Sequence, residues 1–299
     1  MSVITHLRAI AVAAVEPSTL VAFYHETWGL QPLDSSSDPQ REISFRANGA
    51  EHHVLTLTQG DGHSLDLISL GAASRQDVDQ LADTLRRANV AIARGPGPRE
   101  SLGGGYAVTF RDPEGRLVEV SADVAEAEPI GSPAQGPDRL SHIVLNSVNV
   151  RESVEFYTSL LGFEISDWYE NDQMVFLRCN SRHHCIVFAP GKWTSLNHVA
   201  FEVASADEVM KALGRLRKAG VETIWGPGRH GPGGNVFCYF QDPAGNVIEY
   251  TAELLEIDAE WQPHAWERNA DNADVWGTSG GITPAVIAAM ANPPVGERR

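Results

Sequence analysis

Hydrophobic and polar residues along the chain follow the same order twice, about 130 residues apart. Residues 111–120 (RDPEGRLVEV) and 241–250 (QDPAGNVIEY) each predict a strand, a tight turn and a second strand. Residues 77–90 and 208–221 each have the apolar spacing of one amphipathic helix, and Gly-Pro-Gly follows both. Near the start of each copy, a predicted strand precedes a helix that contains Phe-Tyr. The pattern therefore indicates an internal repeat.

Each copy divides into two units of one strand, one helix and three short strands, with too few helices to cover both faces of a parallel sheet. The predicted class is α+β: tandem βαβββ modules form two similar domains, each a curved open β-barrel with flanking helices. We expect domains at 1–127 and 139–253, a linker rich in Pro and Gly at 128–138, and a C-terminal tail at 254–299. The tail contains Trp261, Trp266 and Trp276 and is expected to pack. It is either a lid with Trp261 or Trp266 in the pocket wall, or a segment that simply packs or forms a subunit contact.

Composition narrows the function classes. The 299 residues carry a net charge of −16 without a basic cluster, which disfavours nucleic acid and anionic membranes as partners. No apolar run reaches the length of a membrane span. The apolar stretch at residues 7–15 is interpreted as a strand because its pattern recurs later in the chain. Three cysteines without a CxxC pair fit a reducing cytoplasm.

Two histidines and one glutamate are predicted to face the interior of the second copy. Alternation along 140–146 and 196–203 turns His142 and His198 inward, and a hairpin centred on Ala244 pairs Tyr239 with Glu249. Two histidines and one carboxylate form the facial triad that binds Fe(II) and leaves coordination positions open; Mn(II) is an alternative. Each residue could instead be a satisfied core residue, but a buried Glu249 without a cation would be costly.

The first copy provides an internal comparison. When the two copies are aligned, His6 and Glu119 match two of the three triad residues, His142 and Glu249. Leu67 stands where the second copy has His198. Thr109 replaces Tyr239, and Arg99 lies roughly where His230 is found. We therefore expect no complete metal site in the first domain.

Further chemistry-bearing residues are predicted near the triad. Neighbours in the strand predicted at 183–188 point to opposite faces, so only one of His183 and His184 can face the metal. The first copy also carries a His-His pair, so the doublet could be structural. His230 lies in a glycine-rich loop at 226–235, which can bring it to the mouth of a site or leave it in solvent.

The chain resembles the type I extradiol ring-cleaving dioxygenases of the vicinal oxygen chelate superfamily. The resemblance rests on the tandem modules and on three motifs: LSHIVLN at 140–146, NHVAF at 197–201, and the segment from Gly-Arg-His at 228–230 through Tyr239 to Glu249. It implies that His142, His198 and Glu249 bind Fe(II), with Mn(II) as the alternative. It also implies that His184, His230 and Tyr239 act on substrate and oxygen.

The implied reaction is cleavage of a catechol-type aromatic diol by O2, beside the diol, to a ring-opened semialdehyde in aromatic compound catabolism. His184 is expected to be the acid–base, because a neutral imidazole can accept a diol proton near neutral pH. Tyr239 and His230 are expected to hydrogen-bond the reacting oxygens. The family also suggests a homo-oligomer. Two alternatives are a glyoxalase-like metal-dependent isomerase or epimerase and a non-catalytic small-molecule-binding protein of the same superfamily.

Overall fold

The computed structural model describes residues 3–33, 42–62, 64–131, 135–172 and 174–293. Both predicted domains, the linker and the tail therefore each contain residues that lie outside the described ranges. These residues are 1–2, 34–41 and 63 in the first domain, 132–134 in the linker, 173 in the second domain and 294–299 in the tail. All six predicted metal-binding and catalytic residues are described.

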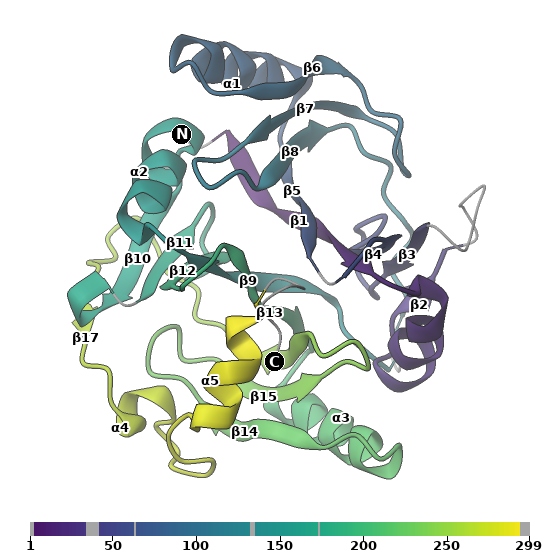
Figure 1. The fold of residues 1–299 in the computed structure, drawn as a ribbon, viewed down its shortest axis with the longest axis vertical. Helices are drawn as coiled ribbons and strands as arrows, with labels where there is room; N and C mark the ends of the chain where they lie inside the picture. The colour runs from purple at the N-terminus through teal and green to yellow at the C-terminus, as the bar shows by residue number, and fades with distance from the viewer. Residues whose placement is uncertain (1–2, 34–41, 63, 132–134, 173, 294–299) are drawn as a thin grey trace.

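The described part of the first half forms one eight-stranded sheet with the order β2-β3-β4-β1-β5-β8-β7-β6 (Figure 1). Its elements are β1 (Ile4–Ala14), η1 (Pro17–Leu20), η2 (Phe23–Thr27), β2 (Gln31–Pro32), β3 (Glu42–Arg46), β4 (Leu55–Gln59), β5 (Leu65–Ala72), α1 (Arg75–Arg87), β6 (Ile92–Pro98), β7 (Tyr106–Arg111) and β8 (Leu117–Ala122). The apolar run at 7–15 forms most of β1, so its interpretation as a strand is confirmed.

The second half repeats this arrangement in a nine-stranded sheet with the order β14-β15-β16-β13-β9-β12-β11-β10-β17, again among described residues. Its elements are β9 (Arg139–Ser147), α2 (Val150–Leu161), β10 (Glu164–Tyr169), η3 (Glu170–Asp172), β11 (Met174–Arg178), β12 (Ile186–Pro190), β13 (Ser195–Glu202), α3 (Ala206–Lys218), β14 (Thr223–Arg229), β15 (Val236–Gln241) and β16 (Val247–Ala252).

Strand pairing confirms the βαβββ modules. The first strand of each module runs parallel to its last strand, in the pairs β1–β4, β5–β8, β9–β12 and β13–β16. The two modules of each half join through an antiparallel pair, β1–β5 or β9–β13. Each sheet is curved (Figure 1), as the predicted class requires.

Equivalent local signals start the long helices. Ser74 caps α1 by accepting a hydrogen bond from the Asp77 backbone N–H, and Ser205 caps α3 through the Glu208 N–H. The apolar positions of α1 and α3 are spaced at three and four residues and are buried against the sheets. Sequence spacing thus fixes which face of each helix covers its sheet.

The two halves share their core. Trp28, which directly follows η2, is fully buried and stacks on Tyr250 of β16 with ring centroids 3.8 Å apart. The Tyr24 hydroxyl donates to the Asp242 carboxylate over 2.8 Å, and Arg116 of the first half donates to the Asn146 carbonyl of the second over 2.9 Å. The predicted domains are therefore interlocked rather than joined by the linker alone.

The tail adds β17 (Ala265–Trp266), α4 (Ala270–Ala273) and α5 (Pro284–Ala291) to the second half (Figure 1, yellow). β17 pairs in parallel with the end of β10. α5 packs against β13, and the carbonyl of Met290 accepts a hydrogen bond from the Asn146 side chain over 2.8 Å. The prediction that the tail packs is confirmed.

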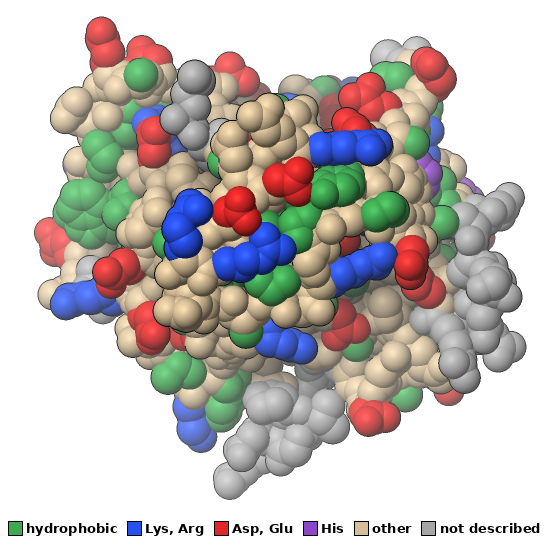
Figure 2. Space-filling view, turned by 90° about the horizontal axis from the view of Figure 1, so that it is seen from above, with side chains coloured by type: hydrophobic (Ala, Val, Ile, Leu, Met, Phe, Trp, Pro, Cys, Tyr) green, Lys and Arg blue, Asp and Glu red, His purple; other side chains and the backbone are tan. Residues whose placement is uncertain are grey.

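The surface agrees with the charge analysis. On the face shown in Figure 2, Lys and Arg side chains lie among Asp and Glu side chains and between small apolar patches. None of the described helices is both long and apolar enough to cross a bilayer.

Candidate metal centre

Three neighbouring strands bring His142, His198 and Glu249 together. His142 of β9 pairs with Ala200 of β13, and Ala200 pairs with Glu249 of β16, so the three side chains come from adjacent positions on one face. A bulge between Leu196 and His198 adjusts the direction of the second histidine. The predicted pairing of Tyr239 with Glu249 is confirmed in the β15–β16 hairpin.

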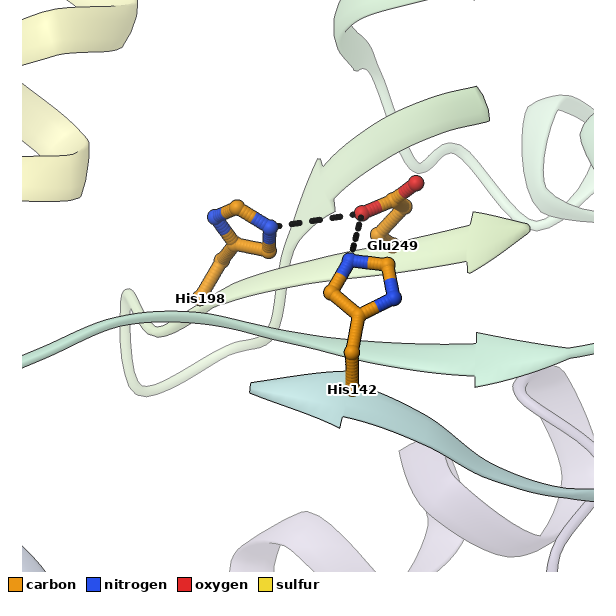
Figure 3. Close-up of side chains that lie close together, drawn as sticks. All are labelled: His142, His198 and Glu249. Carbon is orange, nitrogen blue, oxygen red and sulfur yellow. Dashed lines mark ion pairs between the residues drawn. The ribbon is translucent and has the colours of Figure 1, made fainter. Parts of the chain in front are cut away.

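The donor atoms converge on one small space (Figure 3). His142 Nε2 and His198 Nε2 each lie 3.3 Å from the same Glu249 oxygen, Oε2, and one ligand atom from each residue lies within 4.8 Å of the others. All three side chains are buried. His198 Nε2 and Glu249 Oε2 have no hydrogen-bond partner among the described residues.

Unpaired buried polar atoms are costly unless a ligand satisfies them. The donor set of two imidazoles and one carboxylate therefore fits a divalent metal ion of the Fe(II) or Mn(II) type.

Electrostatics keep these donors in their metal-binding forms. Burial lowers the pKa of His198, although Glu249 opposes this shift, so the imidazole is neutral at neutral pH. Burial alone would raise the pKa of Glu249, but His142 and His198 lower it below its ordinary value. A neutral imidazole and an ionised carboxylate are the forms that bind metals.

A chain of amides fixes the orientation of His198. The Asn146 side-chain NH2 donates to the Met290 carbonyl, and its oxygen accepts from the Asn197 NH2 over 2.9 Å. The Asn197 oxygen is therefore left to accept from His198 Nδ1 over 2.8 Å. With its proton on Nδ1, His198 presents the Nε2 lone pair to the centre, as metal-binding histidines generally do.

The first half differs more than the sequence alignment indicated. Ile10 pairs with Leu55 where Ile143 pairs with Ile186, so the counterpart of His142 is Ala9 and the assignment of His6 was wrong. Bulges on both sides of His6 and Leu7 shift the strand, and His6 instead lies 2.7 Å from Glu51.

The remaining carboxylate of the first half has a cation of its own. Arg99 Nε donates to the buried Glu119 over 2.7 Å. The guanidinium thus supplies the positive charge that Glu119 needs, and the expectation of no complete metal site there stays a prediction with a physical reason.

A cavity of about 570 Å³ opens onto the candidate metal centre. Tail residues line part of it, including Ile287 and Met290 of α5, so the tail forms a wall. Trp261 and Trp266 do not line this cavity, so the alternative that places them in its wall is not supported. Their indole N–H groups donate instead to Ser166 and Asp167 of β10, over 2.8 Å each. The tryptophans that do line the cavity are Trp193 and Trp225.

The side chains of His183 and His184 point in different directions, as predicted. His184 lines the cavity with its ring centroid 4.5 Å from that of His142, whereas His183 Nε2 lies 3.0 Å from Asp167. The predicted strand at 183–188 begins late, because β12 starts at Ile186 and the His183 backbone N–H donates to Leu255 of the tail. Burial lowers the pKa of His184 well below its ordinary value, and neighbouring histidines lower it further.

His230 and Tyr239 also line the cavity, and they contact each other. His230 Nδ1 lies 2.8 Å from the Ala273 carbonyl, which can only accept, so Nδ1 carries the proton. His230 Nε2 must then accept from the Tyr239 hydroxyl over 3.0 Å. Burial lowers the pKa of His230 to about 4 and raises that of Tyr239 well above 10, so both are neutral at neutral pH.

Three polar residues around the centre were missed from the sequence: Asn146, Asn197 and Asp167. Alternation places Asn146 on the same face as His142 and would have indicated it. Asn197 lies next to His198 in a bulge that alternation does not predict. Asp167 contacts the tail almost a hundred residues later, for which the sequence carries no local signal.

Comparison with known proteins agrees with this geometry. Residues 5–120 and 139–250 each match the model of the Glyoxalase/Bleomycin resistance protein/Dioxygenase superfamily. The crystal structure of the Mn(II)-bound glyoxalase from Novosphingobium aromaticivorans is similar with a TM-score of 0.89 and 40% identity, covering 96% of this chain and 95% of that one.

Two curated relatives match most of the chain. A manganese-dependent 2,3-dihydroxybiphenyl 1,2-dioxygenase of Geobacillus genomosp. 3 is 28% identical over 273 residues, which are 83% of this chain and 85% of that enzyme. An iron-dependent extradiol dioxygenase of Rhodococcus jostii is 26% identical over 301 residues, 91% of this chain and 96% of that enzyme. The resemblance inferred from the motifs is thus confirmed, and the chain belongs to the Glyoxalase/Bleomycin resistance protein/Dioxygenase superfamily, the vicinal oxygen chelate proteins.

Proposed function

We propose that the protein cleaves a catechol-type aromatic diol with O2 at the ring bond beside the diol, and so acts as an extradiol dioxygenase in aromatic compound catabolism. The observation that carries the proposal is the content of one cavity. Three buried side chains that could hold a metal ion lie beside a neutral His184, a neutral His230 and the hydroxyl of Tyr239, and two of the three, His198 and Glu249, have a donor atom without a partner among the described residues. Relatives that match most of the chain are named extradiol dioxygenases.

His142, His198 and Glu249 are the residues we propose to hold the metal. A bound Fe(II) or Mn(II) with three protein ligands on one face would have open positions for both diol oxygens and for O2, and would couple them electronically. We expect Fe(II), and Mn(II) remains the alternative because the same donor types bind both ions. One relative is named for each metal.

His184 is proposed to take a proton from the diol. A catechol chelates well only after losing protons, and a general base must be neutral before it can accept one. The low pKa of His184 keeps it neutral. Its position beside the His142 ring puts it next to the proposed metal-binding residues, where it can later return the proton to the product.

Tyr239 and His230 are proposed to bind diol or dioxygen oxygens as a pair. The Tyr239 hydroxyl, which donates to His230 in this structure, can rotate to donate to an oxygen in the cavity. His230 Nε2 is an acceptor because its Nδ1–H is committed to Ala273, so it can receive a hydrogen bond from a protonated oxygen. The high pKa of Tyr239 keeps its proton available for donation rather than lost to solvent.

The apolar part of the cavity is proposed to orient the ring and exclude water. Phe176, Trp225 and Met290 line it together with other aromatic and aliphatic side chains. Its size lies within the range of small-molecule sites, and the apolar lining suits an aromatic substrate. The expected homo-oligomeric state is untested by these observations and remains a prediction.

The runner-up is a glyoxalase-like metal-dependent isomerase, which the 40% identity to a protein of that name favours. Such a reaction consumes no O2. The set of Tyr239 with the pair His184 and His230 beside the triad is also unusual for that chemistry. A binding protein without turnover would leave the same groups unused.

Oxygen uptake distinguishes these functions. The protein is loaded anaerobically with Fe(II) or Mn(II), and uptake is followed with a panel of catechols together with the yellow ring-opened product. His198→Ala should lose both metal and turnover, whereas His184→Phe should retain the metal and lose turnover. Absence of uptake by metal-loaded protein across the panel would favour the isomerase, and equal metal loss in both variants would contradict the division of roles.

A further inference from the structure

A hydrogen-bonded chain leads from the tail to His184 through two buried residues that have no role in the reaction proposed above. Asp167 Oδ2 lies 3.0 Å from His183 Nε2, and His183 Nδ1 lies 3.0 Å from His184 Nδ1. Asp167 and His183 are both completely buried. His184 is at the end of this chain and lines the cavity.

The direction of these hydrogen bonds follows from the carboxylate. The Asp167 oxygens accept from the His264 backbone N–H over 3.0 Å and from the Trp266 indole N–H over 2.8 Å. Burial alone would raise the pKa of Asp167, but these donors and His183 lower it, so Asp167 is ionised and can only accept. His183 Nε2 must therefore carry a proton.

A neutral His183 then has its lone pair on Nδ1. That nitrogen can only accept, so the proton between the two histidines belongs to His184 Nδ1. A neutral His184 protonated on Nδ1 has its own lone pair on Nε2, on the opposite side of the ring. Gly233 leaves room for this ring, because a Cβ there would lie 2.9 Å from His184 Cε1.

We propose that Asp167 and His183 are positioning residues that hold His184 as the tautomer with its proton on Nδ1 and its lone pair on Nε2, facing the substrate cavity. The inference deepens the proposed function and rests on it only for the consequence that this lone pair takes the diol proton. The opposite tautomer would present an N–H to the diol and could not accept its proton. The tail takes part because His264 and Trp266 hold Asp167 in place.

The tautomer can be measured without turnover. Nitrogen-15 NMR of histidine-labelled protein distinguishes Nδ1–H from Nε2–H, and loading the full-length protein with Zn(II), a diamagnetic ion that binds the same donor types, avoids broadening. In the unsubstituted protein at neutral pH we expect His184 to carry its proton on Nδ1. Finding the proton on Nε2, as a cationic His183 would require, overturns the proposal.

Two variants test the role of Asp167. Trp266→Phe removes the indole donor and should leave the tautomer unchanged, so it serves as the matched control. Adding Asp167→Asn to it lets the amide NH2 face His183 while the amide oxygen still accepts from the His264 N–H. His183 Nε2 must then accept, its Nδ1–H must donate, and His184 should move its proton to Nε2. An unchanged His184 tautomer in the double variant contradicts the proposal.

The kinetic consequence is measured separately. The double variant should retain the metal but lose about 100-fold or more in kcat with little change in KM, because general base catalysis contributes about that much. A reversed tautomer with unchanged kcat would refute the role in proton transfer. If the unsubstituted protein has the expected tautomer but consumes no O2 with any diol, the proposed function fails while the positioning by Asp167 and His183 stands.

Discussion

Replacing Trp28 tests whether the two halves unfold as one unit. The indole is fully buried against Tyr250, Phe201 and Phe240 of the second half, at ring-centroid distances of 3.8, 5.8 and 6.0 Å. Truncating a buried tryptophan to alanine costs about 3–5 kcal/mol, and each lost aromatic pair adds about 0.5–1.5 kcal/mol. The Trp28 indole N–H has no partner among the described residues, so its removal returns about 1–3 kcal/mol.

The net expected loss for Trp28→Ala is about 5 kcal/mol, a large share of the stability of an ordinary domain. Trp28→Phe is the matched variant: it keeps a ring and removes the unpaired N–H, so we expect a loss of about 1 kcal/mol or less. Urea unfolding followed by circular dichroism measures both. Because Phe201 and Tyr250 lie close in sequence to His198 and Glu249, metal affinity should fall with stability in the alanine variant.

Two outcomes would refute this reasoning. A loss below about 1 kcal/mol for Trp28→Ala would mean that the shared core contributes little. A separate early transition of the first half, with the second half unchanged, would mean that the halves are independent domains joined by a linker.

Three further perturbations test other parts of the structure. Arg99→Met leaves the buried Glu119 without its cation and should lower the unfolding free energy, measured in urea, by about 3–5 kcal/mol. Adding Glu119→Gln should recover part of this loss. A loss below about 1 kcal/mol for Arg99→Met would show that Glu119 does not need this partner. Met290→Ala removes part of the cavity wall and should weaken binding of a bulky diol about fivefold to thirtyfold without loss of metal. The control Met210→Ala, at an exposed position, should change neither diol binding nor metal content. Equal effects of the two substitutions would exclude the tail as a wall of the cavity. Burial alone would raise the pKa of Asp274, but hydrogen bonds from Ser279 and backbone N–H groups lower it. The contribution of Asp274 to the free energy of unfolding is therefore present above the unfolded pKa of about 3.9 and is lost as the pH falls through the lower folded pKa. The difference in unfolding free energy between the unsubstituted protein and Asp274→Asn should therefore shrink below about pH 4, and a difference that grows there would contradict this sign.

The sequence predicted the features that depend on local rules. Turn length determines which residues face each other in a hairpin, so the pairing of Tyr239 with Glu249 followed from counting. Strand alternation likewise predicted that His142 and His198 face inward, and that His183 and His184 diverge. The repeat predicted the modules because each unit must bury its apolar face in the same way.

Sequence patterns failed to predict features that depend on strand register or on contacts between segments far apart in the chain. Thr-His-Leu at 5–7 resembles Ser-His-Ile at 141–143, but strand pairing aligns residues 7–14 with 140–147, which made His6 the wrong counterpart of His142. The apolar rings of Trp261 and Trp266 left a place in the cavity wall open as one alternative, but their N–H groups donate to acceptors on β10 instead. Asn197 and Asp167 act through hydrogen bonds to distant segments, which periodicity does not report.

The tail also determines when the site is completed during synthesis. The chain is made from its N-terminus, so His142, His198 and Glu249 emerge from the ribosome before residues 264–291. Those last residues supply the Met290 carbonyl that acts on His198 through two amides, the Ala273 carbonyl bound by His230, and the N–H groups that hold Asp167. A nascent chain can thus bring His142, His198 and Glu249 together first, but the hydrogen bonds that fix the proton positions of its histidines form only after residues 264–291 have emerged.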